Sequence, residues 1–440
     1  MNTFGMKVKA RCFIEYDSVA DLVDIEFEEL ARPVLHIGGG SNLLFTDDFK
    51  GTVLHSKIDF IEILDKCHNI PEAPAFAGSG TPYPGVGKCL LHTNGTLSAD
   101  FKPSNEVLVS VGAGVVFDDF CAWAAKEGLW GVENLSYIPG EVGASAVQNI
   151  GAYGVEVKDV IRRVYCYDTV EEEFVNFSVE ECEYGYRDSI FKDPEVKGRY
   201  IVTHVVFALS RVPQPKLEYG HLKDALAEVA SLSSDPRLRY AVPAAAGCSQ
   251  QKPTGLFALY AHDLAGGGMS LPGDATSAGG TSSESSHCKS ESSHCHSERS
   301  EESLTPSLIR KTIIKIRKEK LPEPAVKGSA GSFFKNPVIS MSDFQRIEAS
   351  AKAELGADYK VPHYDLPDGT VKVPAAWMIE QCGWKGKRSG GAAVWDKQPL
   401  VIVNYTGDAY PEEIIGLEKR IVASVQAKFG VELHPEVEHI

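Results

Sequence analysis

The sequence lacks the features that would place the protein at a membrane or on nucleic acid. No run is long and apolar enough to cross a bilayer, which takes about 20 residues, and the first ten residues, MNTFGMKVKA, contain no apolar signal-peptide core. Lysine and arginine number 44 against 60 aspartate and glutamate residues, a formal net charge of −16. We expect a cytoplasmic protein because the signal-peptide core is missing. We expect no nucleic-acid or membrane partner because such a surface repels nucleic acid and anionic lipid.

Signs of disulfides and of a metal site are also missing. The ten cysteines are mostly isolated and, without a signal peptide, are more typical of buried thiols. Five residues invite a zinc interpretation, but their spacing fits no closed Cys/His site, so no metal is predicted. They are His287, Cys288, His294, Cys295 and His296.

Two common catalytic signatures are absent as well. The glycines at 38–40 do not form G-x-G-x-x-G, so a Rossmann dinucleotide site is not indicated. Ser332 lies in Ala-Gly-Ser-Phe-Phe rather than in G-x-S-x-G, which argues against a nucleophile. A proton-donating hydroxyl in an apolar wall and an ordinary Gly-Ser turn stay open for this serine.

The rest of the sequence indicates strands and helices in two units, with two insertions. We interpret the insertion near 68–105 as a surface loop and the one near 232–303 as a disordered low-complexity segment. Residues 133–154 are too glycine-rich to predict a packed helix. A helix capped by Ser342 is predicted to end at Gly356, and 310–320 reads as a solvated amphipathic helix. Strands are predicted at 33–37, 51–64, 107–114, 159–168, 200–210 and 399–404, and further helices at 117–125, 374–386 and 411–429.

Two glycine-rich loops carry most of the functional signal. GGGSN at 38–42 follows a strand and suits an anion-binding nest for a pyrophosphate, although a plain tight turn is the alternative. The segment at 138–156 has four glycines and places polar Gln148 and Asn149 in an apolar run, where they need partners. Two such loops in one α/β unit predict an extended cofactor.

Arg187 in YGYRDSIFK is the third candidate. Its planar guanidinium could bind a carboxylate or polarise a developing enolate, or it could simply pair with Asp188 or another acid. The spacing does not decide between these roles.

Taken in order, these motifs resemble the MurB family of UDP-N-acetylenolpyruvoylglucosamine reductases, type I branch. The resemblance covers the chain from end to end except for the two insertions. The motifs are NTFG (2–5), GGGSNLLF (38–45), IPGEVGASAVQNIGAYGVE (138–156), YGYRDSIFK (184–192), LEYGHL (217–222), KLPEP (320–324), GSAGSFFKNP (328–337), AAWMIEQCGWKG (375–386) and HPEVE (434–438).

The resemblance implies an α+β fold: a two-subdomain FAD-binding module of the vanillyl-alcohol-oxidase (PCMH) type over 1–212, and a smaller α/β substrate-binding domain over 213–440. It implies FAD and NADPH as cofactors, and UDP-N-acetylglucosamine enolpyruvate as the substrate reduced to UDP-N-acetylmuramate for peptidoglycan. A monomer is expected. Glu438 stands where the family usually has arginine.

The same resemblance implies roles for particular residues. Ser332 would be the proton donor, with Arg187 and Glu436 stabilising the enolate. Tyr219, Lys320, Asn336 and Gln398 would hold the UDP-sugar. FAD would be bound by Gly38, Gly39, Gly40, Ser41, Asn42, Gly140, Gly143, Ala144, Ser145, Asn149, Gly151, Ala152 and Gly154.

Two other functions compete with this one. The first is another oxidoreductase on the same flavin fold, against which the Ser332 and Glu436 motifs argue. The second is a flavin-binding protein whose activity has been lost or changed.

Overall fold

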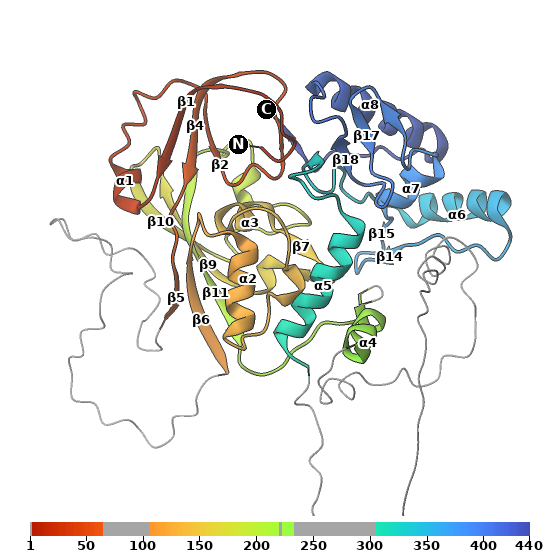
Figure 1. The fold of residues 1–440 in the computed structure, drawn as a ribbon, viewed down its shortest axis with the longest axis horizontal. Coiled ribbons are helices and arrows are strands. Elements are labelled where there is room, and N and C mark those ends of the chain that lie inside the picture. Colours follow the sequence, from red (N-terminus) through yellow and green to blue (C-terminus); the bar gives the residue numbers. More distant parts are fainter. Residues whose placement is uncertain (1, 65–104, 220–221, 233–303) are drawn as a thin grey trace, which may run out of the picture.

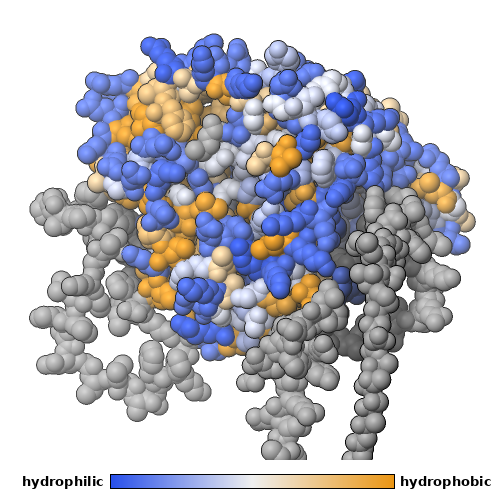
Figure 2. Space-filling view, viewed as in Figure 1, coloured by the Kyte–Doolittle hydropathy of each residue, from blue (hydrophilic) through white to orange (hydrophobic). Residues whose placement is uncertain are grey.

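The computed structural model describes residues 2–64, 105–219, 222–232 and 304–440. Apart from their end residues 105 and 232, the two predicted insertions lie outside these ranges, as do the histidines and cysteines between 287 and 296. In the described part, none of the helices combines the length and apolar character that a bilayer crossing demands. Figure 2 shows hydrophilic residues over much of one face, with smaller hydrophobic areas between them.

A small parallel sheet begins the fold. Its order is β1 (Ala10–Tyr16), β4 (Phe49–Ser56) and β2 (Val34–Ile37), with α1 (Val19–Val23) beside it. The central strand β4 is buried from Gly51 onward, as a central parallel strand should be. The predicted strands at 33–37 and 51–64 are confirmed, the second as β4 and the separate β5 (Ile61–Leu64).

A larger antiparallel sheet follows, in the order β10-β9-β11-β6-β5. Helices α2 (Phe117–Lys126) and α3 (Val142–Gln148) lie against it, and its core is rich in valine and phenylalanine (Figure 1). The predicted strands and the helix at 117–125 are confirmed. The predicted strands are β6 (Glu106–Gly112), β9 (Ile161–Asp168) and β11 (Tyr200–Ser210), whereas β10 (Glu173–Ser178) was not predicted.

The expectation that 133–154 is too glycine-rich for a packed helix was wrong. Helix α3 is buried within this segment, and a side chain on Gly143 would meet the Cβ of Ala113 at 2.9 Å. The small residues therefore allow the helix to approach β6 closely, which glycine content alone does not indicate. The rest of the segment and its surroundings form η1 (Glu133–Leu135), β7 (Gly151–Ala152), β8 (Val155–Glu156), η2 (Val157–Asp159) and, after β10, η3 (Ile190–Lys192).

Two helices connect the N-terminal sheets to the remainder of the chain. Helix α5 (Pro306–Lys320) packs on α2 and on α4 (Leu222–Leu232), and Ile309 and Ile313 share a buried cluster with Trp130. The amphipathic helix expected at 310–320 is confirmed, with an apolar face that is packed rather than solvated. The helix at 222–232 had no counterpart among the predictions.

The C-terminal unit has its own core between short sheets and three helices. Helix α8 (Pro411–Phe429) packs on β17 and β18, and the predicted helices at 374–386 and 411–429 and the strand at 399–404 are confirmed. The remaining elements are β12 (Gly328–Ser329), β13 (Val338–Ile339), α6 (Met341–Leu355), β14 (Tyr364–Asp365), β15 (Val371–Lys372), α7 (Ala375–Gln381), β16 (Arg388–Ser389), β17 (Ala392–Val394) and β18 (Ile402–Asn404).

Both ends of the chain join the two units (Figure 1). Phe4 is buried in the C-terminal core, and its carbonyl accepts a hydrogen bond from the Asn404 side chain. At the other end, β19 (Glu438–His439) pairs in parallel with β3 (Leu43–Leu44) of the N-terminal unit. The residues just before β19 are thereby placed beside the loop that precedes β3.

The cap of α6 differs from the predicted one. Ser340, not Ser342, is the N-cap, and its hydroxyl accepts a hydrogen bond from the Asp343 amide at 3.1 Å. Replacing it leaves that amide without its cap, so Ser340→Ala should lower the free energy of unfolding by about 1 kcal/mol. Urea unfolding of both serine variants measures this. Ser342→Ala is the matched control and should change it by less than about 0.5 kcal/mol; equal losses would contradict the assignment.

Candidate active site

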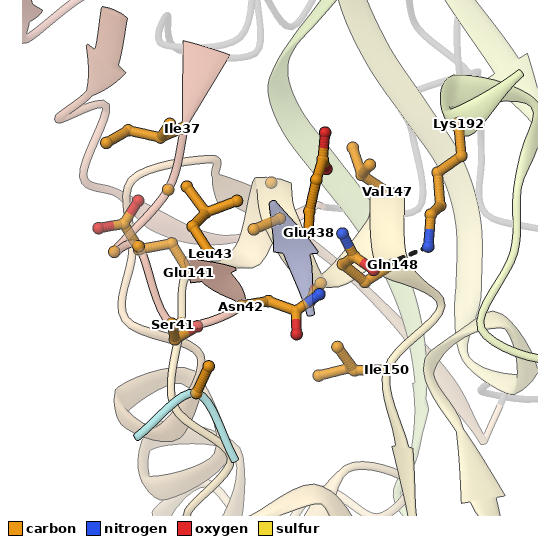
Figure 3. A pocket seen from close by; sticks show the side chains of 18 of the residues that line it. Ile37, Ser41, Asn42, Leu43, Glu141, Val147, Gln148, Ile150, Lys192 and Glu438 are labelled. Atoms are coloured by element: carbon orange, nitrogen blue, oxygen red, sulfur yellow. Dashed lines mark hydrogen bonds between the residues drawn. The ribbon is translucent and has the colours of Figure 1, made fainter. Parts of the chain in front are cut away.

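A large cavity lies where the two units meet. Its volume is about 880 Å³, within the range of about 300–1,000 Å³ typical of cofactor and ligand sites. Its wall includes the loop after β2, helix α3 with the loop before it, the segment around Arg187, and two C-terminal segments, 330–335 and 435–438. Figure 3 shows Ser41, Asn42 and Gln148 around the same space.

The first glycine-rich loop, 38–42, leaves the carboxyl end of β2 and lines this cavity. Gly40 has a φ of +65°, a conformation that suits glycine. A side chain on Gly38 would meet the Cβ of Ala144 at 3.0 Å, so the loop lies directly on α3. The Ser41 hydroxyl donates to the carbonyl of Pro139 at 3.1 Å.

The second glycine-rich segment interlocks with the first. Gly140 has a φ of +119°, and a side chain there would lie 2.9 Å from the Ser41 hydroxyl. Gly143, Ala144, Ser145 and Gly151 also line the cavity. The two loops thus form one continuous wall of small residues, as an extended ligand requires.

Arg187 and Glu436 form an ion pair in the cavity wall. Nε of Arg187 lies 2.9 Å from Oε1 of Glu436, and both side chains are 17% exposed. Arg187 has a φ of +55°, and its terminal nitrogens donate to the carbonyls of Asn149 and Gly151. The alternative pairing with Asp188 is not formed. These contacts use three of the five guanidinium N–H groups, so two remain for a ligand.

Ser332 also lines the cavity, half-buried in front of the buried Phe333 and Phe334. The backbone of Glu436 donates to the carbonyl of Phe333 at 2.8 Å, so the serine segment and the glutamate segment run side by side. The three residues proposed for chemistry from the motifs therefore lie in one wall, although 145 residues separate Arg187 from Ser332 in the sequence.

Burial raises the pKa of the Glu436 carboxyl above its ordinary value, although Arg187, Lys192 and Lys335 act in the opposite direction. Burial and the nearby Lys335 lower the pKa of Lys192. Lys192 donates to the Gln148 side chain and to the Arg187 carbonyl, both at 3.0 Å (Figure 3). Gln148, which the sequence placed in an apolar run, thus has the partner it needs.

Some residues singled out in the sequence lie outside the cavity lining. The Asn149 side chain is buried and donates to Glu156 and to the Gly185 carbonyl, which is a role in shaping the loop. The other residues outside the lining are Ala152, Gly154, Tyr219, Lys320, Asn336 and Gln398.

The four residues expected to bind the UDP-sugar make the following contacts in the structure. Tyr219 lies against Gly154 and stacks on Tyr364, while Asn336 contacts the Tyr186 hydroxyl at 3.4 Å and caps α7 through the Ala375 amide. The exposed Lys320 ends α5, and its carbonyl accepts a hydrogen bond from the Trp395 indole; the carbonyl of Gln398 accepts one from the Val401 amide.

Other residues in and around the cavity were not indicated by any sequence pattern. Arg317 of α5 reaches the lining, whereas the lysine that ends the same helix does not. His36 lines the cavity and bonds the Tyr16 hydroxyl, while the buried His55, which is not part of the lining, lies between Glu15 and Glu141. A charged residue within a strand or a glycine-rich loop looks like ordinary surface until the tertiary contacts are known. Among the residues with described positions, no cluster of histidine, cysteine and carboxylate groups suits a metal.

Comparison with known proteins shows which class of protein the N-terminal unit belongs to. The FAD binding domain family matches residues 10–176, so the N-terminal unit is an FAD-binding module. The cavity agrees with that class, because both glycine-rich loops of the N-terminal unit line it.

The C-terminal unit identifies the family within this class of FAD-binding proteins. Residues 323–440 match the C-terminal domain of UDP-N-acetylenolpyruvoylglucosamine reductase. The reductase of that name from Bacteroides fragilis (strain YCH46) is 38% identical over 440 residues, covering 100% of this chain and 97% of the relative; that from Porphyromonas gingivalis is 35% identical over 444 residues, covering 100% and 96%. The chain therefore belongs to the UDP-N-acetylenolpyruvoylglucosamine reductase family.

A solved structure agrees on the fold. The crystal structure of the Thermus caldophilus reductase has a TM-score of 0.50 and 19% identity, and the match covers 100% of this chain and 95% of that one. At this identity the likeness supports the fold alone.

The buried His55 gives a pH dependence. Its hydrogen bond to Glu141, and secondly that to Glu15, raises its pKa above 6.5 despite burial. A histidine with a raised pKa in the folded state contributes stability below 6.5, and this is lost as the pH rises through the folded pKa. The free energy of unfolding should therefore fall further between about pH 6 and about pH 9 in the wild type than in His55→Asn. Denaturant unfolding across this range checks it, and parallel curves would contradict it.

Proposed function

We propose that this protein catalyses the NADPH-dependent, FAD-mediated reduction of UDP-N-acetylglucosamine enolpyruvate to UDP-N-acetylmuramate, a step in peptidoglycan precursor synthesis. The observation that carries the proposal is the meeting of Arg187, Ser332 and Glu436 in the wall of one cavity with both glycine-rich loops. Three separate segments supply them, so a common task explains their meeting better than local folding does.

The cofactor site is assigned to the two loops. Residues 38–42 would hold the pyrophosphate through backbone N–H groups, and 140–154 would run along the rest of the molecule. When bound, FAD would take a hydride from NADPH and supply it to the enolpyruvyl group of the substrate. Gly38, Gly39, Gly40, Ser41, Asn42, Gly140, Gly143, Ala144, Ser145 and Gly151 support this placement by lining the cavity.

Arg187 would bind the substrate carboxylate and stabilise the enolate. Its guanidinium is oriented by Glu436 and by two carbonyls, so its remaining N–H donors are held in place before a ligand binds. Lys192 would hold this arrangement, since it bonds the carbonyl of Arg187 and the Gln148 side chain.

Ser332 would deliver the proton to the substrate carbon. A serine hydroxyl is a weak acid, so it needs a site that stabilises the alkoxide or replaces the proton. A relay through Glu436 is supported by position, because its segment is hydrogen-bonded to the segment that carries Ser332.

The UDP part of the substrate is assigned to residues outside the main cavity. Tyr219, Lys320, Asn336 and Gln398 would bind it, and Arg317 offers a further positive charge in the cavity wall. We assign residues 213–440 to a substrate domain, although α4 and α5 pack on the N-terminal unit. A cytoplasmic monomer is part of the same proposal.

One anaerobic titration tests the function. The purified protein should be yellow, bleach when NADPH is added, and recolour when UDP-N-acetylglucosamine enolpyruvate follows, with the flavin absorbance as the readout. Each half-reaction is seen separately. Bleaching without recolouring would favour a flavoprotein of different activity, and a colourless protein that takes up no FAD would exclude every flavin-dependent function.

Ser332→Ala separates the two half-reactions. Because the serine is assigned only to the proton step, the variant should keep bleaching by NADPH within about 3-fold and lose recolouring by at least about 100-fold, the size of a general-acid contribution. Stopped-flow absorbance measures both rates. Ser340→Ala, in the same unit but at the cap of α6, is the control; equal loss of both half-reactions in Ser332→Ala would refute the role.

A further inference from the structure

Three charged side chains run in a row from β1 to the first glycine-rich loop. Nδ1 of His55 lies 2.9 Å from Oε1 of Glu15, and its Nε2 lies 3.0 Å from Oε1 of Glu141. The His55 side chain is only 1% exposed. Because both ring nitrogens face carboxylate oxygens, both act as donors, which is the bonding pattern of the imidazolium.

The sheet register places this row behind the loop. Glu15 of β1 and Ile37 of β2 both stand opposite His55 on the central strand β4. Ile37 is the last residue before Gly38, so the imidazole lies at the edge where the loop begins. Glu141 approaches from the other subdomain, as the N-cap of α3.

The Glu141 carboxylate is packed against the glycines and lines the cavity. Its Oε2 lies 3.2 Å from the position that a side-chain carbon on Gly38 would take, and its Oε1 lies 3.7 Å from that on Gly39. Figure 3 shows the carboxylate directed toward the strand that carries Ile37. Between residues of described position, the only hydrogen bond to this carboxylate uses Oε1, so Oε2 keeps its acceptor capacity.

The charge of the row restricts what can lie there. One imidazolium between two carboxylates leaves a net charge of about −1, so a phosphate beside Glu141 would be repelled. A carboxylate accepts hydrogen bonds strongly from hydroxyl groups. The Gly38 end of the loop therefore suits a sugar hydroxyl, and the phosphates belong nearer Ser41 and Asn42.

We propose that Glu141 accepts a hydrogen bond from a sugar hydroxyl of FAD, in the ribityl chain or in the adenosine ribose, and that His55 is the positioning residue that holds its carboxylate. This assignment rests on the proposed function, in which the cavity binds FAD. It divides the first glycine-rich loop into a sugar end and a phosphate end.

A purely structural role makes a different prediction. The row joins β4 of one subdomain to α3 of the other, and a tie of that kind would stabilise the fold without distinguishing one flavin from another. Selectivity among flavins that differ by one hydroxyl therefore separates the two roles.

The experiment measures the dissociation constant of the full-length protein for FAD and for deoxy analogues by quenching of flavin fluorescence. One set lacks a single ribityl hydroxyl, and the other lacks the 2′- or 3′-hydroxyl of the adenosine. In the wild type, one analogue should bind roughly 10- to 100-fold more weakly than FAD, as expected for one hydrogen bond to a charged group. Which set contains it identifies the sugar.

Glu141→Ala should bind FAD roughly 10- to 100-fold more weakly and should no longer discriminate against that analogue. Glu106→Ala removes a surface carboxylate, paired with Arg162 and outside the cavity lining, and should bind every flavin as the wild type does.

The outcomes distinguish the two proposals. Wild-type protein that binds FAD but treats all analogues alike overturns the inference even if Glu141→Ala does not fold. So does a Glu141→Ala variant that binds FAD normally or keeps the discrimination. Wild-type protein that binds no FAD removes the proposed function, and the inference with it.

Discussion

The pairing of the last seven residues with two distant segments is the constraint on which the site depends. The Glu436 amide bonds the carbonyl of Phe333, and the Glu436 carbonyl accepts from the side chain of Asn42 at 3.0 Å. One residue is thus tied by its backbone to both the C-terminal core and the glycine-rich loop. β19 then extends the pairing along β3. Without these bonds Glu436 would have no fixed position opposite Arg187.

Arg187, the ion-pair partner of Glu436 in the same wall, is also held in place by its hydrogen bonds. Its backbone is left-handed, a conformation that costs a non-glycine residue of order 1–3 kcal/mol. It is retained because the side chain is bonded to Glu436 and to two carbonyls, and the Arg187 carbonyl is bonded to Lys192. Strain of this kind is typical of functional positions. The guanidinium is thereby oriented before any ligand arrives, so binding need not supply the cost of ordering it.

Close packing of small residues also shapes the cavity. Gly38, Gly140 and Gly143 each stand where a side chain would meet a neighbour at about 3 Å. The backbone of each of these glycines therefore packs directly against a small neighbouring side chain. The row of Glu15, His55 and Glu141 lies behind the Gly38 end of this wall and makes that end more negative than the Ser41 end.

Local pattern was sufficient for most elements and insufficient where packing overrides it. The spacing of apolar residues in α2 and α8 predicted those helices, because an amphipathic period survives in any fold with one buried face. The spacing of apolar residues did not predict α3, because the burial of this helix depends on glycine and alanine rather than on large apolar residues. It also misplaced the cap of α6 by two residues, since Ser340 and Ser342 are chemically alike and only the backbone decides which hydroxyl reaches the free amide.

The sequence by itself determined the family, the two glycine-rich loops and the identities of Arg187, Ser332 and Glu436 as candidates, because long motifs of unusual composition can be recognised without coordinates. Tertiary structure alone decided that Arg187 pairs with Glu436 rather than with Asp188, that Arg317 lines the cavity while Lys320 does not, and that His55 joins Glu15 to Glu141. The physical reason is range: these contacts join residues far apart in the chain, and their geometry depends on how two sheets and a C-terminal core pack together.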